Sequence, residues 1–173
     1  MRAFDLGCGS GATANMLSQI GFQVSGVDPS QRGISLANTT YPHLDLQVGS
    51  TNDDLSGFGQ FPLVISLEVI EHCFCAKTFA RCVRRLLVPG GIAIVSTPYH
   101  GYAKNLGLAL LGRMDRHYQA LRTGGHIKFW SAATIRKLFS EVELEVDQIL
   151  RVGRLAPFAK SMIVVARKPV SLI

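Results

Sequence analysis

A glycine-rich loop near the start of the chain constrains the fold more than any other feature. Three glycines at alternate positions, Gly7, Gly9 and Gly11, follow an apolar segment at 2–6 and precede a helix-type segment at 12–20. Glycine adopts positive φ angles and lets a ligand approach the backbone closely. The free N–H groups at the start of the following helix attract a carboxylate or a phosphate. The pattern therefore predicts a strand–loop–helix unit that binds a ligand carrying such a group.

A single carboxylate, Asp28, ends the second apolar segment at 23–27 and lies 19 residues after Gly9. In nucleotide-binding sheets a carboxylate at this place accepts hydrogen bonds from the ribose hydroxyl groups. Either feature alone is compatible with an ordinary turn and a helix cap. Because both occur at this spacing on the first two strands, they favour a nucleotide-like ligand.

Apolar β-type segments and segments of helical periodicity alternate through the first 98 residues. We expect strands at 2–6, 23–27, 44–48, 63–67 and 92–97, and helices at 12–20, 30–39 and 76–87. A helix capped by Ser131 and strands at 142–146 and 162–166 follow. This alternation predicts an α/β fold with a parallel sheet that is covered on both faces.

The alternation stops between residues 99 and 130, where no strand is expected. An apolar run with four leucines is interrupted by Gly107 and Gly112, and a basic segment ends at Gly124 and Gly125. Such a long interruption is uncommon unless it has a function of its own. We therefore expect one domain over residues 1–173, with residues 99–130 inserted as a lid or binding loop.

The positive charge of the chain is concentrated in one stretch. The chain has 18 basic and 12 acidic residues, a net charge of +6. Residues 99–137 contain seven basic residues and one acidic residue, which is a net charge of +6 in this stretch alone. This charge is compatible with a nucleic acid, an anionic membrane surface or an acidic substrate, and it selects none of them.

Cysteine usage and the apolar segments indicate the compartment. Cys8, Cys73, Cys75 and Cys82 form neither a CxxC pair nor a zinc-ribbon spacing, so we expect reduced, mostly buried thiols. No signal-peptide core follows Met1. The longest apolar run outside the strands is far shorter than the roughly 20 residues of a membrane span. A soluble cytoplasmic protein is expected.

Asp5 discriminates between two ligands that suit the loop. Gly7, Gly9 and Ala12 also match the G-x-G-x-x-G/A pattern of dinucleotide binding. The carboxylate of Asp5 lies two residues before the first glycine, where it would repel a pyrophosphate and attract the ammonium group of an amino acid. A single domain also leaves no room for a hydride acceptor. An NAD-dependent dehydrogenase is therefore disfavoured.

Four motifs give the chain a family resemblance. They are D-x-G-x-G-x-G at 5–11, Val27-Asp28, Ser66-Leu67-Glu68 and Leu87-Val88-Pro89-Gly90-Gly91. On these motifs the sequence resembles the class I SAM-dependent methyltransferases, in which S-adenosylmethionine (SAM) donates a methyl group. The resemblance implies a Rossmann-like doubly wound sheet of about seven strands, mostly parallel with an antiparallel last strand. It also implies that residues 99–130 form a substrate lid.

The resemblance assigns the residues that hold SAM. The implied contacts are Asp5, Gly7, Cys8, Gly9, Gly11, Asp28, Pro29, Ser50, Leu67 and Glu68. In this assignment Asp5 and the loop hold the methionine part, Asp28 holds the ribose and Pro29 lines the adenine slot. Ser50 departs from the family, which often has an acidic residue facing the adenine. The family's N-terminal covering helix is also absent, which implies a more open pocket, a truncated chain or a completing partner.

An acidic and histidine-rich turn, Glu68-Val-Ile-Glu71-His72, follows the fourth strand, and His126 follows Gly124-Gly125. On a helical turn both carboxylates and the imidazole would share a face. The pattern looks like the small-RNA 2′-O-methyltransferases, in which two Glu and two His bind a metal, and like the ubiquinone-pathway O-methyltransferases. Three roles stay open: Glu68, Glu71, His72 and His126 hold Mg²⁺ or Mn²⁺, His72 or His126 is a metal-free general base, or the turn is structural.

Paired carboxylates and histidines favour O-methylation of a small-molecule acceptor, because a hydroxyl must lose a proton. RNA or an anionic membrane surface, held by the basic stretch 99–137, and a non-catalytic partner subunit with this fold remain alternatives. The oligomeric state is open. We expect that neutralising Arg113, Arg116 and Arg122 raises the KM for the acceptor and leaves SAM affinity unchanged.

Overall fold

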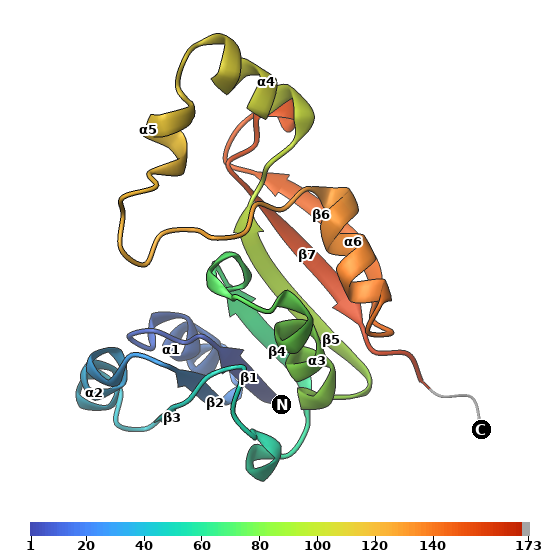
Figure 1. The fold of residues 1–173 in the computed structure, drawn as a ribbon. Coiled ribbons are helices and arrows are strands. Elements are labelled where there is room, and N and C mark those ends of the chain that lie inside the picture. The colour runs from blue at the N-terminus through green and yellow to red at the C-terminus, as the bar shows by residue number, and fades with distance from the viewer. Residues whose placement is uncertain (171–173) are drawn as a thin grey trace.

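The computed structural model describes residues 1–170 and has one seven-stranded sheet in the order β3-β2-β1-β4-β5-β7-β6 (Figure 1). The strands are β1 (Arg2–Leu6), β2 (Gln23–Asp28), β3 (Asp45–Val48), β4 (Phe61–Leu67), β5 (Leu87–Pro98), β6 (Glu145–Val152) and β7 (Ser161–Arg167). Strands β1 to β5 pair in parallel, whereas β7 is antiparallel to both β5 and β6. The expected Rossmann-like doubly wound sheet with an antiparallel last strand is confirmed.

Four helices cover the two faces of this sheet. They are α1 (Ala12–Gln19), α2 (Gln31–Thr40), α3 (Ala76–Leu86) and α6 (Ala132–Ser140). The apolar residues of α1 and α2 belong to one buried cluster and those of α3 and α6 to another. Successive residues of β4 alternate between the two clusters: Val64 belongs to the larger one and Ile65 to the smaller. A strand in such a sheet must be apolar on both faces, which explains its nearly continuous apolar sequence.

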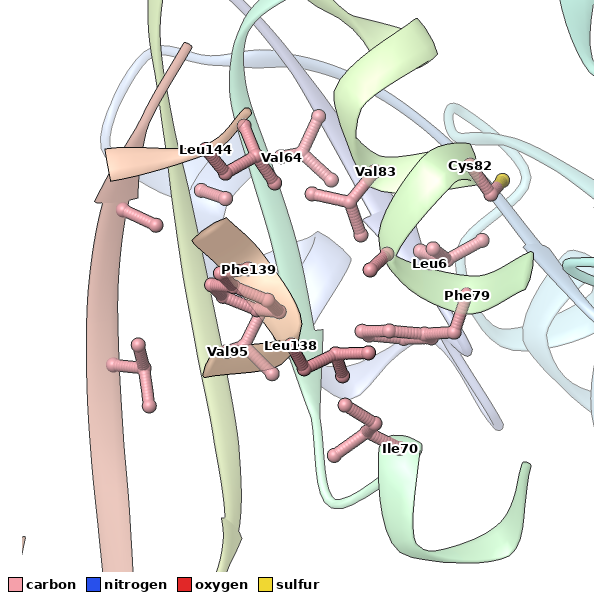
Figure 2. Packing of buried hydrophobic residues seen from close by; sticks show 14 of the residues in the cluster. Leu6, Val64, Ile70, Phe79, Cys82, Val83, Val95, Leu138, Phe139 and Leu144 are labelled. Atoms are coloured by element: carbon pink, nitrogen blue, oxygen red, sulfur yellow. The ribbon is translucent and has the colours of Figure 1, made fainter. Parts of the chain in front are cut away.

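The larger core lies between the sheet and the helices α3 and α6. Figure 2 shows Phe79 and Val83 of α3 and Phe139 of α6 packed over Val64 and Val95 of the central strands. All five are buried. On α3 the expected apolar face is buried, and Arg81 and Arg85 on the other face are exposed. Burial of this face fixes α3 on the sheet, and with it the turn that precedes α3.

The strand expected at 142–146 is wrong in its bounds. Residues 142–144 form the turn that ends α6: Glu143 has φ +55°, and the Leu144 N–H donates to the Phe139 carbonyl at 2.9 Å. Val142 and Leu144 alternate with polar residues because both cap the end of the larger core. The strand β6 begins only at Glu145 and continues to Val152.

The motif Pro89-Gly90-Gly91 lies inside β5, not before it. The pairing of β4 with β5 shifts register here, since Phe61 pairs with Leu87 and Leu63 with Ile92. The Gly90 N–H donates to the Lys168 carbonyl at 2.8 Å, so the motif forms an irregularity that still bonds to the chain after β7. Positive φ at Gly90 makes glycine suitable at this point.

The lid, residues 99–130, leaves the end of β5 and returns to α6 as an arch beyond the sheet (Figure 1). It contains α4 (Tyr102–Leu110) and α5 (Met114–Tyr118) and, apart from the single bridge between Tyr99 and Trp130, no strand. The His100 N–H also donates to the Trp130 carbonyl at 2.8 Å. The two ends of the lid therefore meet at one point on the sheet.

The structure also tests the expectations that the thiols are reduced and mostly buried and that no segment spans a membrane. All four cysteines are free; Cys8 and Cys82 are buried, Cys73 is half-buried and Cys75 is exposed. The expectation of mostly buried thiols therefore holds for only two of them. In the part of the chain that the structure describes, no helix is long and apolar enough to cross a membrane.

Candidate active site

The glycine-rich loop between β1 and α1 bends over the end of β2. The N–H groups of Gly7 and Cys8 both donate to the Val27 carbonyl, at 2.8 and 3.1 Å. The Gly9 N–H donates to Asp28 Oδ2 at 2.9 Å. The structure thus brings together the two motifs that the sequence analysis singled out, because β1 and β2 are parallel neighbours whose carboxyl ends share one edge.

The glycines of the loop have different structural roles. A Cβ atom on Gly7, which has φ +88°, would lie 2.4 Å from Val69 Cγ2. On Gly11 it would contact the Leu46 and Ala37 side chains at 2.9 and 3.2 Å. On Gly9 it would meet nothing within 4 Å. Gly7 and Gly11 are therefore required by packing, whereas Gly9 borders open space next to Asp28.

Asp5 is a buried carboxylate, 2% exposed, and its Oδ2 atom has no hydrogen-bond partner among the described residues. Burial, followed by the negative charge of Asp28, raises the pKa of Asp5 to about 7. A buried carboxylate without a partner is unfavourable unless a cation approaches it. The site therefore favours a ligand that brings a positive charge to this oxygen.

A cavity of about 540 Å³ lies at the carboxyl ends of β1, β2 and β3; we call it the cofactor cavity. Of the implied SAM contacts, Gly7, Pro29 and Ser50 line it. The other implied contacts, which are not among its lining residues, are Asp5, Cys8, Gly9, Gly11, Asp28, Leu67 and Glu68. Asp28 adjoins the lining residue Pro29, and its two oxygens already accept the N–H groups of Gly9 and Ser30, at 2.9 and 2.8 Å. Each oxygen keeps a second lone pair for a ligand hydroxyl.

Part of the wall of this cavity consists of residues that were not predicted from the sequence. Thr51 and Asn52 line it beside Ser50, and Cys73, Phe74 and Cys75 line it as well. The position of Thr51 and Asn52 immediately after the third strand was the available signal, since ligands bind where parallel strands end. The Ser50 hydroxyl donates to Asp53 Oδ2 at 2.9 Å and accepts the Asn52 N–H at 3.2 Å. It is held within its own turn.

The second group of candidate residues is centred on Glu71, in the 3₁₀ turn η2 (Ile70–His72). Glu71 is fully buried, and the Thr97 hydroxyl donates to its Oε2 at 3.0 Å. Its Oε1 has no hydrogen-bond partner among the described residues and lies 4.0 Å from His126 Nε2. Burial is the main cause that raises the pKa of Glu71 to about 7, and the charge of Glu68 contributes to this rise.

Two histidines face Glu71, one from η2 and one from the lid. His72 Nδ1 lies 3.2 Å from the Gly125 carbonyl, which can only accept, so Nδ1 is the donor of this hydrogen bond. The His72 and His126 rings are 5.0 Å apart. Burial, followed by the proximity of His72, lowers the pKa of His126. The N–H groups of Ile127 and Lys128 donate to the Glu71 carbonyl, at 2.9 and 3.0 Å, and so hold this end of the lid on η2.

Three of the four expected metal ligands meet in this cluster. One ligand atom from each of Glu71, His72 and His126 lies within 4.8 Å of the other two. Glu68 is outside the group: its φ is +56°, and its Oε1 accepts the Ser96 hydroxyl at 2.8 Å. The helical turn begins only at Ile70, so the expected i, i+3, i+4 face does not include Glu68.

A second cavity, about 510 Å³, lies under the lid; we call it the lid cavity. A cluster of rings from His100, Tyr118 and Phe129 forms part of its wall, with centroids 4.6–5.9 Å apart. His126 lines the lid cavity and His72 lines the cofactor cavity. The cluster of Glu71, His72 and His126 therefore lies between the two cavities.

Two ubiquinone biosynthesis O-methyltransferases are similar in sequence. The one from Caulobacter sp. (strain K31) is 36% identical over 117 residues, 65% of this chain and 46% of that protein. The one from Bradyrhizobium diazoefficiens is 34% identical over 115 residues, 65% of this chain and 45% of that protein. The chain thus spans about half the length of the curated relatives it matches.

Solved structures share the fold at low sequence identity. An S-adenosylmethionine-dependent methyltransferase from Mesorhizobium loti has a TM-score of 0.76 at 17% identity, covering 96% of this chain and 90% of that one. The [4+2]-cyclase SpnF has a TM-score of 0.75 at 15% identity, covering 98% and 76%. Proteins named for different reactions therefore share this fold. A family model described as a methyltransferase domain matches residues 1–149, and the chain belongs to this methyltransferase domain family.

Proposed function

We propose that this chain transfers a methyl group from SAM to a hydroxyl group of a small-molecule acceptor. The observation that carries the proposal is the cluster of Glu71, His72 and His126 between the cofactor cavity and the lid cavity. A donor in one cavity and an acceptor in the other would meet beside these side chains. The similar proteins named as O-methyltransferases support oxygen as the acceptor atom.

The cofactor side suits the functional groups of SAM. The unpartnered oxygen of Asp5 would accept a hydrogen bond from the ammonium group of the methionine part. Asp28 would accept the ribose hydroxyls with the lone pairs that its backbone contacts leave free. Pro29 and Ser50 line the cavity, and the adenine would lie beside them.

The reaction is an in-line displacement in which the acceptor oxygen bonds to the methyl carbon as the carbon–sulfur bond breaks. The electron pair stays on sulfur, giving S-adenosylhomocysteine, and the hydroxyl proton passes to His126 Nε2. Partial burial lowers the pKa of His126, which favours the neutral ring that can accept this proton. The imidazolium would then be stabilised by Glu71, whose Oε1 lies 4.0 Å from Nε2. His72 positions the lid through Gly125.

The same three side chains fit a divalent cation as an aid to this reaction. The fit rests on three close donor atoms and on the unpartnered oxygen of Glu71. One carboxylate and two imidazoles suit Mn²⁺ better than Mg²⁺, which prefers oxygen ligands. A bound ion would lower the pKa of an acceptor hydroxyl. Metal-dependent transfer is the second candidate, and Glu71, His72 and His126 would hold the ion.

Cofactor binding is tested by calorimetry with SAM, S-adenosylhomocysteine and NAD. We expect SAM and its product to bind and NAD not to bind. Asp28→Asn keeps an oxygen for one backbone contact and should weaken SAM binding about tenfold or more, because it removes the charge facing the ribose. Asp45→Asn, on exposed β3, is the matched control. Binding of NAD, or unchanged SAM affinity in Asp28→Asn, would contradict the proposal.

Methyl transfer is tested with a catechol acceptor and labelled SAM. His126→Ala should lower kcat about 10²–10⁴-fold, the usual contribution of a general base, with little change in SAM affinity. Chelator treatment followed by Mn²⁺ or Mg²⁺ addition separates metal-dependent transfer from catalysis by a metal-free general base. Activity that does not change with chelator would support the metal-free general base. Transfer to an RNA 3′ end and not to the catechol would overturn the small-molecule acceptor.

A further inference from the structure

The lid cavity has an unusual set of charges. Five basic side chains line it: Lys104, Arg113, Arg122, Arg154 and Lys160. No aspartate or glutamate is among the described residues that line the cavity. Arg154 and Lys160 come from the connection between β6 and β7, outside the basic stretch 99–137, so the fold adds two cations to those of the lid.

These five cations form no ion pair within residues 1–170. Elsewhere in the molecule Lys77 pairs with Glu141, Arg84 with Glu143 and Arg167 with Asp147. Like charges around one hollow repel each other, and the charge of Arg154 contributes to the lowered pKa of half-buried Lys104, after burial itself. An anion inside the cavity would relieve this repulsion.

Most of the remaining wall is apolar or aromatic, and Gln119 is a polar exception. Leu108 and Leu111 contribute from α4 and its end, and Phe158 contributes from the 3₁₀ turn η3 (Ala156–Phe158). The ring cluster of His100, Tyr118 and Phe129 adds flat surfaces against which a planar ring can pack. The wall therefore suits an apolar or aromatic body, and the cations suit a negatively charged group on that body.

We propose that the acceptor is an amphiphilic anion: an apolar or aromatic body that carries a carboxylate or a phosphate. The inference rests on the proposed function, because it names the acceptor class for the same reaction. Arg154 and Lys160, together with Lys104, Arg113 and Arg122, hold the anionic group, and the ring cluster holds the body. His126, at the border of the cavity, faces the hydroxyl that receives the methyl group.

The three lid arginines that we expect to affect the KM for the acceptor differ in position. Arg113 and Arg122 line the cavity, but Arg116 does not; it is an exposed residue of α5. Neutralising Arg116 should therefore leave acceptor binding unchanged. Because Arg116 belongs to the same lid and carries the same charge, it is a matched control for the arginines of the cavity.

The test compares 3-(3,4-dihydroxyphenyl)propionate with its primary amide, which has the same catechol ring without the charge. Calorimetry without SAM should give about tenfold tighter binding of the acid, as expected for charge-assisted hydrogen bonds. Arg154→Gln and Lys160→Gln should each reduce that preference and should abolish it together, and Arg116→Gln should keep it. The phosphonate analogue identifies the anion: tighter binding than the propionate indicates a phosphate, and weaker binding a carboxylate.

Two results would overturn the proposal. One is equal binding of the acid and the amide. The other is an acid preference that survives in the double variant while thermal melts show that the variant is folded. The reaction is measured separately with labelled SAM. Transfer to both probes with equal KM would refute the anionic acceptor and leave the proposed function intact, whereas selective binding of the acid without any transfer would refute the proposed function.

Discussion

At the residue scale, Asp5 is a binding-site residue that lowers the stability of the ligand-free protein. Its carboxylate is buried, and its pKa is raised from 3.8 to about 7. Between these two pH values the folded chain binds more protons than the unfolded chain, so this residue lowers the stability as pH rises. The loss of stability is complete above about pH 7, where the buried carboxyl group of Asp5 must ionise. A cationic ligand would reverse it.

We predict that Asp5→Asn stabilises the ligand-free protein. At pH 8 the free energy of unfolding should rise by up to roughly 4 kcal/mol, and the gain should be smaller at pH 5, where the wild-type carboxyl is protonated in the folded state. Urea unfolding at both pH values measures the difference. Asp45→Asn, an exposed control, should change stability little at either pH. A gain that is equal at pH 5 and pH 8 would contradict the ionisation argument.

Asp5 also predicts a proton linkage in cofactor binding. Under the proposed function, the ammonium group of SAM pairs with ionised Asp5, so binding near pH 7 must release part of a proton from a group whose pKa is about 7. SAM affinity should therefore rise as pH increases from 6 to 8. Calorimetry in two buffers with different ionisation enthalpies detects the released proton. Identical heats in both buffers at pH 7 would show that Asp5 does not pair with the ligand.

At the scale of elements, the β1–α1 loop and the turn after β4 are joined by one contact. A Cβ on Gly7 would overlap Val69, and φ of +88° disfavours any side chain there. Gly7→Ala should therefore cost about 2–4 kcal/mol, from left-handed backbone strain and overpacking together. Gly9→Ala, with φ +54° and open space around it, should cost only the backbone part, about 1–2 kcal/mol.

A double-mutant cycle separates the two parts. Val69→Ala in the Gly7→Ala background should recover the stability lost to overlap but not that lost to backbone strain. Urea unfolding of the four proteins in the cycle gives the coupling between the two positions. Strict additivity of Gly7→Ala and Val69→Ala would show that the loop does not pack on this turn.

The sequence predicted the elements that depend on a local pattern. Strands β1, β2 and β4 contain short apolar runs, and α3 has an apolar face, so the sequence pattern located them. The strand β5 (Leu87–Pro98) begins before the expected 92–97, because its first residues include the motif Pro89-Gly90-Gly91. The strand β6 was misplaced because Val142 and Leu144 alternate with polar residues for a different reason: they close the core at the end of α6. Periodicity records burial, not the backbone conformation that produces it.

The part of the candidate site that lies at the carboxyl ends of adjacent parallel strands could be predicted from the sequence. Asp5, the glycines and Asp28 meet because adjacent parallel strands bring their carboxyl ends together. Glu68 lies outside the 3₁₀ turn of Glu71 because its φ is positive and its carboxylate accepts the Ser96 hydroxyl, and neither is visible in the residue types. Its side chain still lies close enough to raise the pKa of Glu71. Arg154 and Lys160 could not be assigned to the lid cavity, since only the antiparallel return of β7 brings them there.

At the scale of the whole molecule, the chain separates two tasks. Residues 1–98 supply the cofactor cavity and carry six basic and seven acidic residues, so this part is nearly neutral. The lid and the β6–β7 connection supply the lid cavity and the unpaired cations. Only the cluster at Glu71 belongs to both, with His126 contributed by the lid. Cofactor binding and acceptor binding should therefore be separable by changes in the lid.

The last prediction is that the lid can be removed without unfolding the sheet. Its ends are joined by the Tyr99–Trp130 bridge, and α4 and α5 contain no buried residue. Replacing residues 101–129 with a Gly/Ser linker of about six residues would span these ends. Because the core clusters draw on the sheet and the other helices, the variant should unfold cooperatively, with a Tm within several degrees of the parent.

In this variant SAM affinity should stay within about threefold of the parent, which is less than 1 kcal/mol, while the anionic probe no longer binds. Methyl transfer should also be lost, since His126 is removed with the lid. Calorimetry with SAM and with the propionate probe measures the two affinities independently of turnover. If SAM binding disappears while the melt stays cooperative, the lid contributes to the cofactor cavity, and the division of the molecule into two tasks is wrong.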